Sequence, residues 1–159
     1  MPDILFVCTA NQFRSPIAAA YFTRKLRETG CAEGFSVSSA GTWTPEGLPA
    51  HQRAIEAGAK FNLDLKLHRT REVNADILNK ANLIIVMQQG HREALEAEFP
   101  ETQGKVHLLG ELAQITEIEI NDPAAENFRN AEETTRIICL CIDRCFQDIV
   151  RKVSEATSH

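Results

Sequence analysis

The sequence lacks the long hydrophobic runs of membrane proteins and the basic stretches of nucleic-acid-binding proteins. No segment approaches the roughly 18 consecutive apolar residues of a transmembrane helix, and no basic segment followed by a long apolar run opens the chain as in a signal peptide. Its 159 residues carry a formal net charge of −5, which argues against nucleic acid as a partner. We therefore expect a cytoplasmic protein that binds neither membranes nor nucleic acids.

Cysteines are few, and their spacing argues against two common uses. The five are Cys8, Cys31, Cys139, Cys141 and Cys145. Their number is odd and no pair has C-x-x-C spacing, so a disulfide framework is not expected. The last three lie in a helical pattern without a histidine nearby, so we interpret them as small apolar core residues and predict no metal site. Four histidines show no clustering in the sequence: His51, His91, His107 and His159.

Apolar runs alternate with helical patterns along the chain. Residues 4–7 and 83–87 are continuous apolar runs, as in strands that are buried on both faces. Further strands are predicted at 35–39 and 105–109, and helices at 15–29, 50–60, 74–80, 89–99 and 126–155. This alternation predicts parallel βαβ units in a single domain over residues 1–155, with a short mobile tail at 156–159.

The segment VCTANQFRSP, residues 7–16, lies between the first predicted strand and the first predicted helix. Such a loop lies at the carboxyl edge of a parallel sheet, where backbone N–H groups and the helix N-terminus bind anions. We read Ser15 as the N-cap and Pro16 as the first helical residue. Arg14 offers a planar fork for an oxyanion, and the positive field favours the thiolate of Cys8, to which Ser15 can donate a hydrogen bond.

A thiolate at the base of a phosphate-binding loop is a nucleophile directed at phosphorus. The alternative is that Cys8 merely ends a strand and that Arg14 is a surface cation. The five-residue spacing between them, the preceding strand and the Ser-Pro helix start agree with one another, and they favour catalysis.

Five segments in order resemble one known family. VCTANQFRSPIA resembles the C-x5-R-S-P signature of the low-molecular-weight protein tyrosine phosphatases, and SVSSAGTWTPEGLPA, LHRTREV, LIIVMQQGHREAL and INDPAAENF resemble later segments of the same family. The resemblance implies a three-layer α/β sandwich of the flavodoxin-like phosphatase I fold, with a four-stranded parallel sheet and helices on both faces. It also implies a monomer or weak dimer without a cofactor, acting on phosphorylated proteins such as a tyrosine kinase or its targets.

The resemblance assigns the chemistry to four residues. Cys8 would be the nucleophile, Arg14 would bind the phosphate, and Ser15 would stabilise the thiolate when it leaves. Asp122 would protonate the leaving oxygen and then act as base on the water that hydrolyses the cysteinyl-phosphate. The alternative for Asp122 is a turn residue, because Asp-Pro favours turn initiation.

Other residues would support the loop or line the pocket. Asn11 would hold the loop through hydrogen bonds with Ser39 and His68, and Trp43 and Gln12 would line the pocket. The remaining predicted loop residues are Thr9, Ala10 and Phe13.

The sequence departs from the family pattern at four places. Ala10 stands where the family usually has glycine, and Phe13 replaces a cysteine that can trap the oxidised nucleophile as a disulfide. Ala124 and Ala125 replace aromatic residues that flank phosphotyrosine. Gln12 is neither the aliphatic residue that goes with phosphotyrosine nor the threonine of the protein-arginine phosphatases.

Three other functions compete with a tyrosine phosphatase. A protein-arginine phosphatase shares the loop. A thioredoxin-coupled arsenate reductase also shares it but needs further cysteines after the third strand, and residues 82–91 contain none. A phosphate-binding module without turnover would also fit the altered loop. The glycine patterns of nucleotide-binding loops are absent, which argues against a nucleotide-binding regulator.

Overall fold

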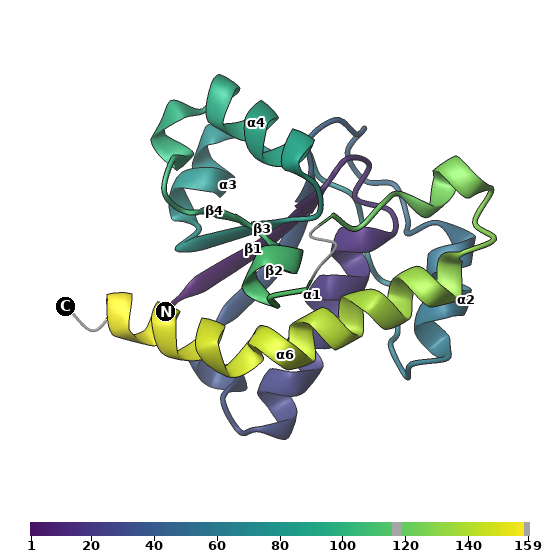
Figure 1. Cartoon of the computed structure of the whole chain (residues 1–159), viewed down its shortest axis with the longest axis horizontal. Coiled ribbons are helices and arrows are strands. Elements are labelled where there is room, and N and C mark those ends of the chain that lie inside the picture. The colour runs from purple at the N-terminus through teal and green to yellow at the C-terminus, as the bar shows by residue number, and fades with distance from the viewer. Residues whose placement is uncertain (116–118, 158–159) are drawn as a thin grey trace.

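The centre of the molecule is a four-stranded parallel sheet (Figure 1). The computed structural model describes residues 1–115 and 119–157. Strands β1 (Asp3–Cys8), β2 (Ser36–Gly41), β3 (Leu83–Val86) and β4 (Val106–Leu108) lie in the order β2-β1-β3-β4, and every pair is parallel. The predicted α/β fold with four parallel strands is thereby confirmed.

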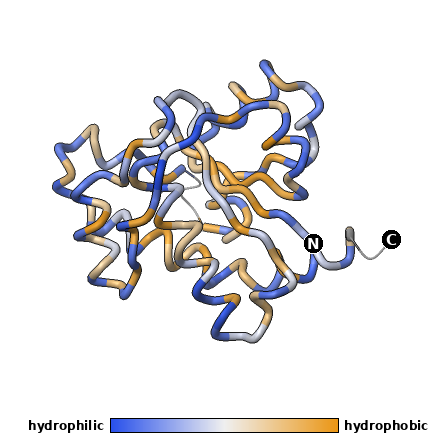
Figure 2. The backbone as a smooth tube through the Cα atoms, turned by 180° about the vertical axis from the view of Figure 1, so that it is seen from behind, coloured by the Kyte–Doolittle hydropathy of each residue, from blue (hydrophilic) through white to orange (hydrophobic). Residues whose placement is uncertain are grey.

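Strand β1 lies inside the sheet, and its side chains alternate between two apolar cores. Ile4, Phe6 and Cys8 belong to one core, and Leu5 and Val7 belong to the other. Because both faces of the sheet are covered, β1 is apolar from Ile4 to Cys8 and β3 is apolar at every position. Figure 2 shows the central strands as the most hydrophobic part of the backbone.

Helices cover both faces of the sheet (Figure 1), as the three-layer prediction requires. Phe22 of α1 packs between Phe6 of the sheet and Phe146 of α6, with ring centroids 5.7 and 5.0 Å apart. On that face lie α1 (Arg14–Glu28), α2 (Gln52–Ala59), α5 (Leu109–Leu112) and α6 (Ala131–Thr157), and on the other lie α3 (Ala75–Lys80) and α4 (Gln89–Glu98). None of the described helices has the length and apolarity needed to cross a bilayer.

The start of α1 differs from the prediction. The helix begins at Arg14, its N-cap position is Phe13, and no side chain caps it. Ser15 is therefore not the N-cap, and Pro16 is the third helical residue rather than the first. The prediction was wrong because the Ser15 hydroxyl is used elsewhere, at the sulfur of Cys8.

The last helix also has different bounds from those predicted. Pro123–Glu126 is a separate 3-10 turn, which the left-handed residues Asn127 (φ 52) and Phe128 (φ 61) separate from α6. At its other end α6 continues through Thr157, two residues beyond the predicted bound, because the segment contains neither glycine nor proline. The mobile tail at 156–159 stays a prediction. Its last two residues, 158–159, lie outside the described residues.

Gly41 ends β2 at the place where the loop after β1 passes it. A Cβ added there would lie 2.5 Å from the Thr9 carbonyl oxygen and 3.2 Å from Asn11 Cβ. We predict that Gly41→Ala lowers the free energy of unfolding by about 1–3 kcal/mol, because the loop must move. Urea unfolding and the amide chemical shifts of residues 9–11 measure this effect. Gly34→Ala, where a Cβ meets nothing within 4 Å, is the matched control, and equal behaviour of the two variants would contradict the prediction.

Candidate active site

The loop between β1 and α1 has its carbonyl groups turned outward. Three of its carbonyl oxygens, including that of Cys8, accept backbone N–H groups from Thr42, Trp43 and His51 at 2.9 to 3.1 Å. Within the described parts of the chain, no N–H group of residues 9–13 has a protein acceptor. Such converging N–H groups next to a helix N-terminus form a binding site for an oxyanion.

A left-handed residue shapes this loop, and it is Asn11 (φ 58) rather than Ala10. Alanine in place of the usual glycine therefore carries no left-handed strain here. Asparagine tolerates the left-handed region better than most residues. The departure at Ala10 is compatible with a normally shaped loop.

Cys8 lies at the base of a cavity of about 60 Å³. Its Sγ is 3.0 Å from Ser15 Oγ, and both residues are buried. Ser15 Oγ accepts a hydrogen bond from Asn11 Nδ2 at 2.9 Å. Ser15 can donate its hydroxyl proton to the sulfur, because the other acceptor near this hydroxyl, the Ala40 carbonyl oxygen, is more distant at 3.5 Å.

The side chain of Asn11 is fully hydrogen-bonded behind the loop. Its Nδ2 also donates to Ser39 Oγ at 2.9 Å, and its Oδ1 accepts from the backbone N–H of Arg71 at 3.0 Å. Its carbonyl oxygen is 2.7 Å from His68 Nε2, which must be the donor because a carbonyl only accepts. Burial lowers the pKa of His68, and the hydrogen bond to Asn11 opposes that shift. The structure thus brings Asn11, Ser39 and His68 together.

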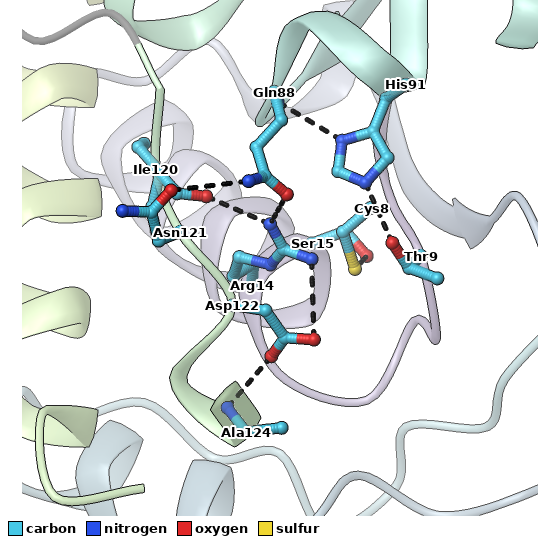
Figure 3. Close-up of polar contacts among 10 residues, drawn as sticks. All are labelled: Cys8, Thr9, Arg14, Ser15, Gln88, His91, Ile120, Asn121, Asp122 and Ala124. Atoms are coloured by element: carbon cyan, nitrogen blue, oxygen red, sulfur yellow. Dashed lines mark hydrogen bonds and ion pairs between the residues drawn. The ribbon is translucent and has the colours of Figure 1, made fainter. Parts of the chain in front are cut away.

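Arg14 is buried with its guanidinium beside the cavity (Figure 3). Its Nη1 donates to Gln88 Oε1 at 2.7 Å and to the carbonyl oxygen of Ile120 at 2.9 Å, and both acceptors are neutral. Its Nη2 lies 3.8 Å from Asp122 Oδ2, the one carboxylate paired with it among the described residues. This long ion pair leaves much of the positive charge available to a bound oxyanion.

Asp122 reaches the cavity from the segment after α5, far from Cys8 in the sequence. Its Oδ1 accepts the Ala124 N–H at 3.0 Å and so caps the 3-10 turn, whereas its Oδ2 is the atom near Arg14. Figure 3 shows the carboxylate directed toward the guanidinium. The role of Asp122 as a turn residue is therefore compatible with its role as a proton donor, because each role uses a different carboxylate oxygen.

Gln88 and His91, which sequence reasoning missed, connect the start of α4 to the site (Figure 3). The Gln88 N–H donates to His91 Nδ1 at 3.1 Å, so that nitrogen carries no proton, and the proton on Nε2 is donated to Thr9 Oγ1 at 2.9 Å. Burial and, to a smaller extent, the charge of Arg14 together lower the pKa of His91 to about 4, against the opposing effect of Asp122. The Q-x-x-H spacing at a helix start resembles a capping box and was the signal available.

The sequence analysis also missed an aromatic wall of the cavity, which is formed by Phe128 with His51 and Phe13. Phe128 lines the cavity, stacks on His51 with ring centroids 4.1 Å apart, and lies 6.1 Å from the ring of Phe13. The left-handed backbone at Phe128 turns the chain back toward the loop. Although Ala124 offers no stacking area, the cavity has an aromatic wall from a residue four positions later.

Two predicted pocket residues have different outcomes. Gln12 lines the cavity, and its Nε2 donates to the Pro49 carbonyl oxygen at 3.2 Å. Trp43 is 79% exposed and is not among the residues that line this cavity, so its place at the pocket stays a prediction. Its backbone N–H donates to the carbonyl oxygen of Thr9 at 3.1 Å.

The cysteines on α6 are buried and poorly suited to redox chemistry. Burial raises the pKa of Cys139 and Cys141 to about 11 and that of Cys145 to about 12. Phe13 packs against Phe128 beside the cavity at the position where a partner thiol would stand. All five cysteines are free. Among the described residues, no three metal-ligating side chains of the His, Cys, Asp or Glu type lie together as a metal ion would need.

The chain has relatives in both sequence and structure. A family model described as "Low molecular weight phosphotyrosine protein phosphatase" matches residues 3–158. A "Probable low molecular weight protein-tyrosine-phosphatase EpsP" of Ralstonia solanacearum is 33% identical over 140 residues, 88% of this chain and 90% of that protein. A "Protein-arginine-phosphatase" of Geobacillus stearothermophilus is 32% identical over 120 residues, 76% and 77% of the two chains. The crystal structure of a low molecular weight protein tyrosine phosphatase from T. tengcongensis gives a TM-score of 0.84 at 28% identity, over 93% and 99% of the two chains.

The low pKa of His91 makes stability depend on pH. The pKa is about 4 in the folded protein against the ordinary value of 6.5, so between these values the unfolded state binds more protons and the free energy of unfolding falls as the pH falls. His91→Gln keeps an N–H donor but does not titrate, so we expect it to remove up to about 3 kcal/mol of this pH dependence. Urea unfolding at pH 7 and pH 4.5 measures it. Identical pH dependence in wild type and variant would contradict a buried neutral His91.

Proposed function

Because the chain belongs to the low molecular weight phosphotyrosine protein phosphatase family, we propose that it hydrolyses phosphorylated protein side chains through a cysteinyl-phosphate on Cys8, without a metal ion. One observation carries the proposal. Cys8, Arg14 and Asp122 line the same small cavity, although they come from β1, α1 and the segment before α6. A nucleophile, an oxyanion ligand and a proton donor are the three groups that phosphoryl transfer needs.

In the first step the phosphate dianion binds to the free N–H groups of residues 9–13 and to the guanidinium of Arg14. These donors are fixed before the substrate arrives, because the buried Asn11 side chain and the neutral acceptors around Arg14 hold them. Preorganised donors stabilise the charge of the transferring phosphoryl group without a cost of reorganisation in the transition state. Gln88 acts here as a positioning residue for Arg14.

Chemistry then proceeds in two displacements at phosphorus. The Cys8 thiolate forms the P–S bond while the P–O bond to the leaving group breaks, and Asp122 gives its proton to that oxygen. The resulting Asp122 carboxylate takes a proton from water, whose oxygen attacks phosphorus and expels the thiolate. Ser15, 3.0 Å from the sulfur, stabilises the departing thiolate by hydrogen bonding. The products are the dephosphorylated hydroxyl group of the substrate and inorganic phosphate, and both Cys8 and Asp122 return to their starting states.

The aromatic wall favours phosphotyrosine as the substrate. Phe128 and His51 present a stacked aromatic surface beside the cavity, and a phenol ring packs well against such a surface. Phosphoarginine is the second candidate, because a relative with that named activity is 32% identical. The ratio of kcat/KM on matched phosphotyrosine and phosphoarginine peptides decides between them.

A reductase and a binding module without turnover have less support. A thioredoxin-coupled reductase needs reactive relay thiols, and burial raises the pKa of each α6 cysteine. A binding module would not need Asp122 beside Arg14. We place the protein in the cytoplasm because its five cysteines are free, and we expect phosphorylated proteins as its partners.

The role of Asp122 predicts a dependence on the leaving group. In metal-free buffer at mildly acidic pH, wild type should hydrolyse both p-nitrophenyl and phenyl phosphate. Asp122→Ala should lower kcat/KM for phenyl phosphate by about 100-fold or more, and less for p-nitrophenyl phosphate, whose leaving group needs little protonation. Asp148→Ala, an exposed aspartate on α6, is the control and should match wild type. Absence of turnover in wild type would overturn the proposed function, and equal losses on both substrates would overturn the acid role.

A further inference from the structure

A second, much larger cavity of about 550 Å³ lies along α1, away from the cavity above Cys8. It is bounded by α1, by the edge strand β2 and by the loop of residues 62–71. The side chains of Ala19, Ala20 and Thr23 are small, and this leaves space for the cavity beside α1. The stretch of α1 beside it, from Pro16 to Arg27, is about 16 Å long at the rise of an α-helix. Its volume falls in the range of small-molecule sites.

The lining of this cavity is strongly cationic although the chain as a whole is acidic. Four arginines, Arg24, Arg27, Arg69 and Arg71, face a single acidic residue, Asp64. The formal net charge of the whole chain is −5. The excess of positive charge around this cavity is therefore a local feature, which the general need for a charged, soluble surface does not explain. Positive charge on concave walls concentrates the electrostatic field and attracts anions.

Most of these arginines lack a carboxylate partner. Among the described residues, the side chain of Arg27 makes no hydrogen bond or ion pair, that of Arg69 donates only to backbone carbonyls, and that of Arg71 donates to Ser39 O and Ser38 Oγ. The exception is Arg24, whose Nε lies 3.5 Å from an exposed glutamate, Glu28, without a hydrogen bond. Guanidinium groups without carboxylates have donors available for an added oxyanion.

We propose that this arginine-lined cavity is a second anion site, which binds a small molecule bearing two or more phosphate groups. Arginines lie on both walls, with Arg24 and Arg27 on the helix and Arg69 and Arg71 on the opposite loop. An oligophosphate offers a separate phosphate group to the arginines of each wall, whereas inorganic phosphate offers only one group. The charge therefore selects for oligophosphates over inorganic phosphate.

The second site contacts the support of the catalytic loop. His68 and Arg71 both line the arginine-lined cavity, and both hold Asn11, through its carbonyl oxygen and its Oδ1. Ser39 also lines it and accepts from Asn11 Nδ2. An oligophosphate bound there therefore touches three of the groups that fix the loop, so the side-chain amide resonances of Asn11 should report its binding.

The test is a titration with tripolyphosphate after the cavity above Cys8 has been saturated with tungstate. Calorimetry of the wild type should give one further equivalent with Kd below about 100 µM, and inorganic phosphate should bind at least about tenfold more weakly. Arg27→Glu combined with Arg69→Glu should raise the Kd for tripolyphosphate at least about tenfold and abolish the shift of the Asn11 side-chain amide. Both arginines are exposed, so the variant should fold.

The matched control is Arg136→Glu combined with Arg151→Glu, which changes the net charge equally on exposed positions of α6. Its Kd should stay within about twofold of wild type. No binding after tungstate saturation, or an equal loss in the control variant, would overturn the second site. The measurement detects binding and not turnover, so it can fail or succeed independently of the proposed phosphatase activity.

Discussion

The conformation of the loop after β1 is the constraint on which the site depends. Its N–H groups are available to a ligand only because its carbonyl groups are bonded outward and Asn11 takes a left-handed conformation. That conformation is held by contacts from two distant segments: β2, through Ser39, and the loop of residues 62–71, through His68 and the backbone N–H of Arg71. A buried polar network of this kind is stable only when every member is satisfied, which explains why a small change such as a methyl group at Gly41 should be felt at the site.

The positive charge of Arg14 is preserved in the cavity because the groups that bind its guanidinium most closely are neutral. Gln88 and the Ile120 carbonyl oxygen orient Arg14 without cancelling its charge, and His91 supports Thr9 in its neutral form because burial lowers its pKa to about 4. The carboxylate of Asp122 is more distant and partly exposed, at 3.8 Å and 43%. The buried guanidinium of Arg14 is therefore incompletely paired until a phosphate dianion binds. The ion pair that then forms contributes to the free energy of binding.

Much of the fold and part of the site could be predicted from the sequence. Continuous apolar runs identified β1 and β3, and the C-x5-R spacing located the loop because all its parts are local. The missed residues depend on contacts distant in sequence. Gln88 and His91 follow β3, whereas Arg14 and Thr9, which they contact, follow β1. Phe128 reaches the cavity through a left-handed turn that composition does not reveal. Ser15 was misread as an N-cap because its hydroxyl had two possible partners, and the tertiary structure selects the sulfur of Cys8.

The most direct measurement of the central claim is to trap the phosphorylated enzyme. Wild type and Asp122→Ala are mixed with p-nitrophenyl phosphate, quenched in acid within the first turnovers, digested and mapped by mass spectrometry, with Cys8→Ala as the control. The account predicts phosphate on the peptide that contains Cys8 in the first two proteins, and neither label nor turnover in Cys8→Ala. Turnover by Cys8→Ala, or phosphate on a different residue, would contradict it.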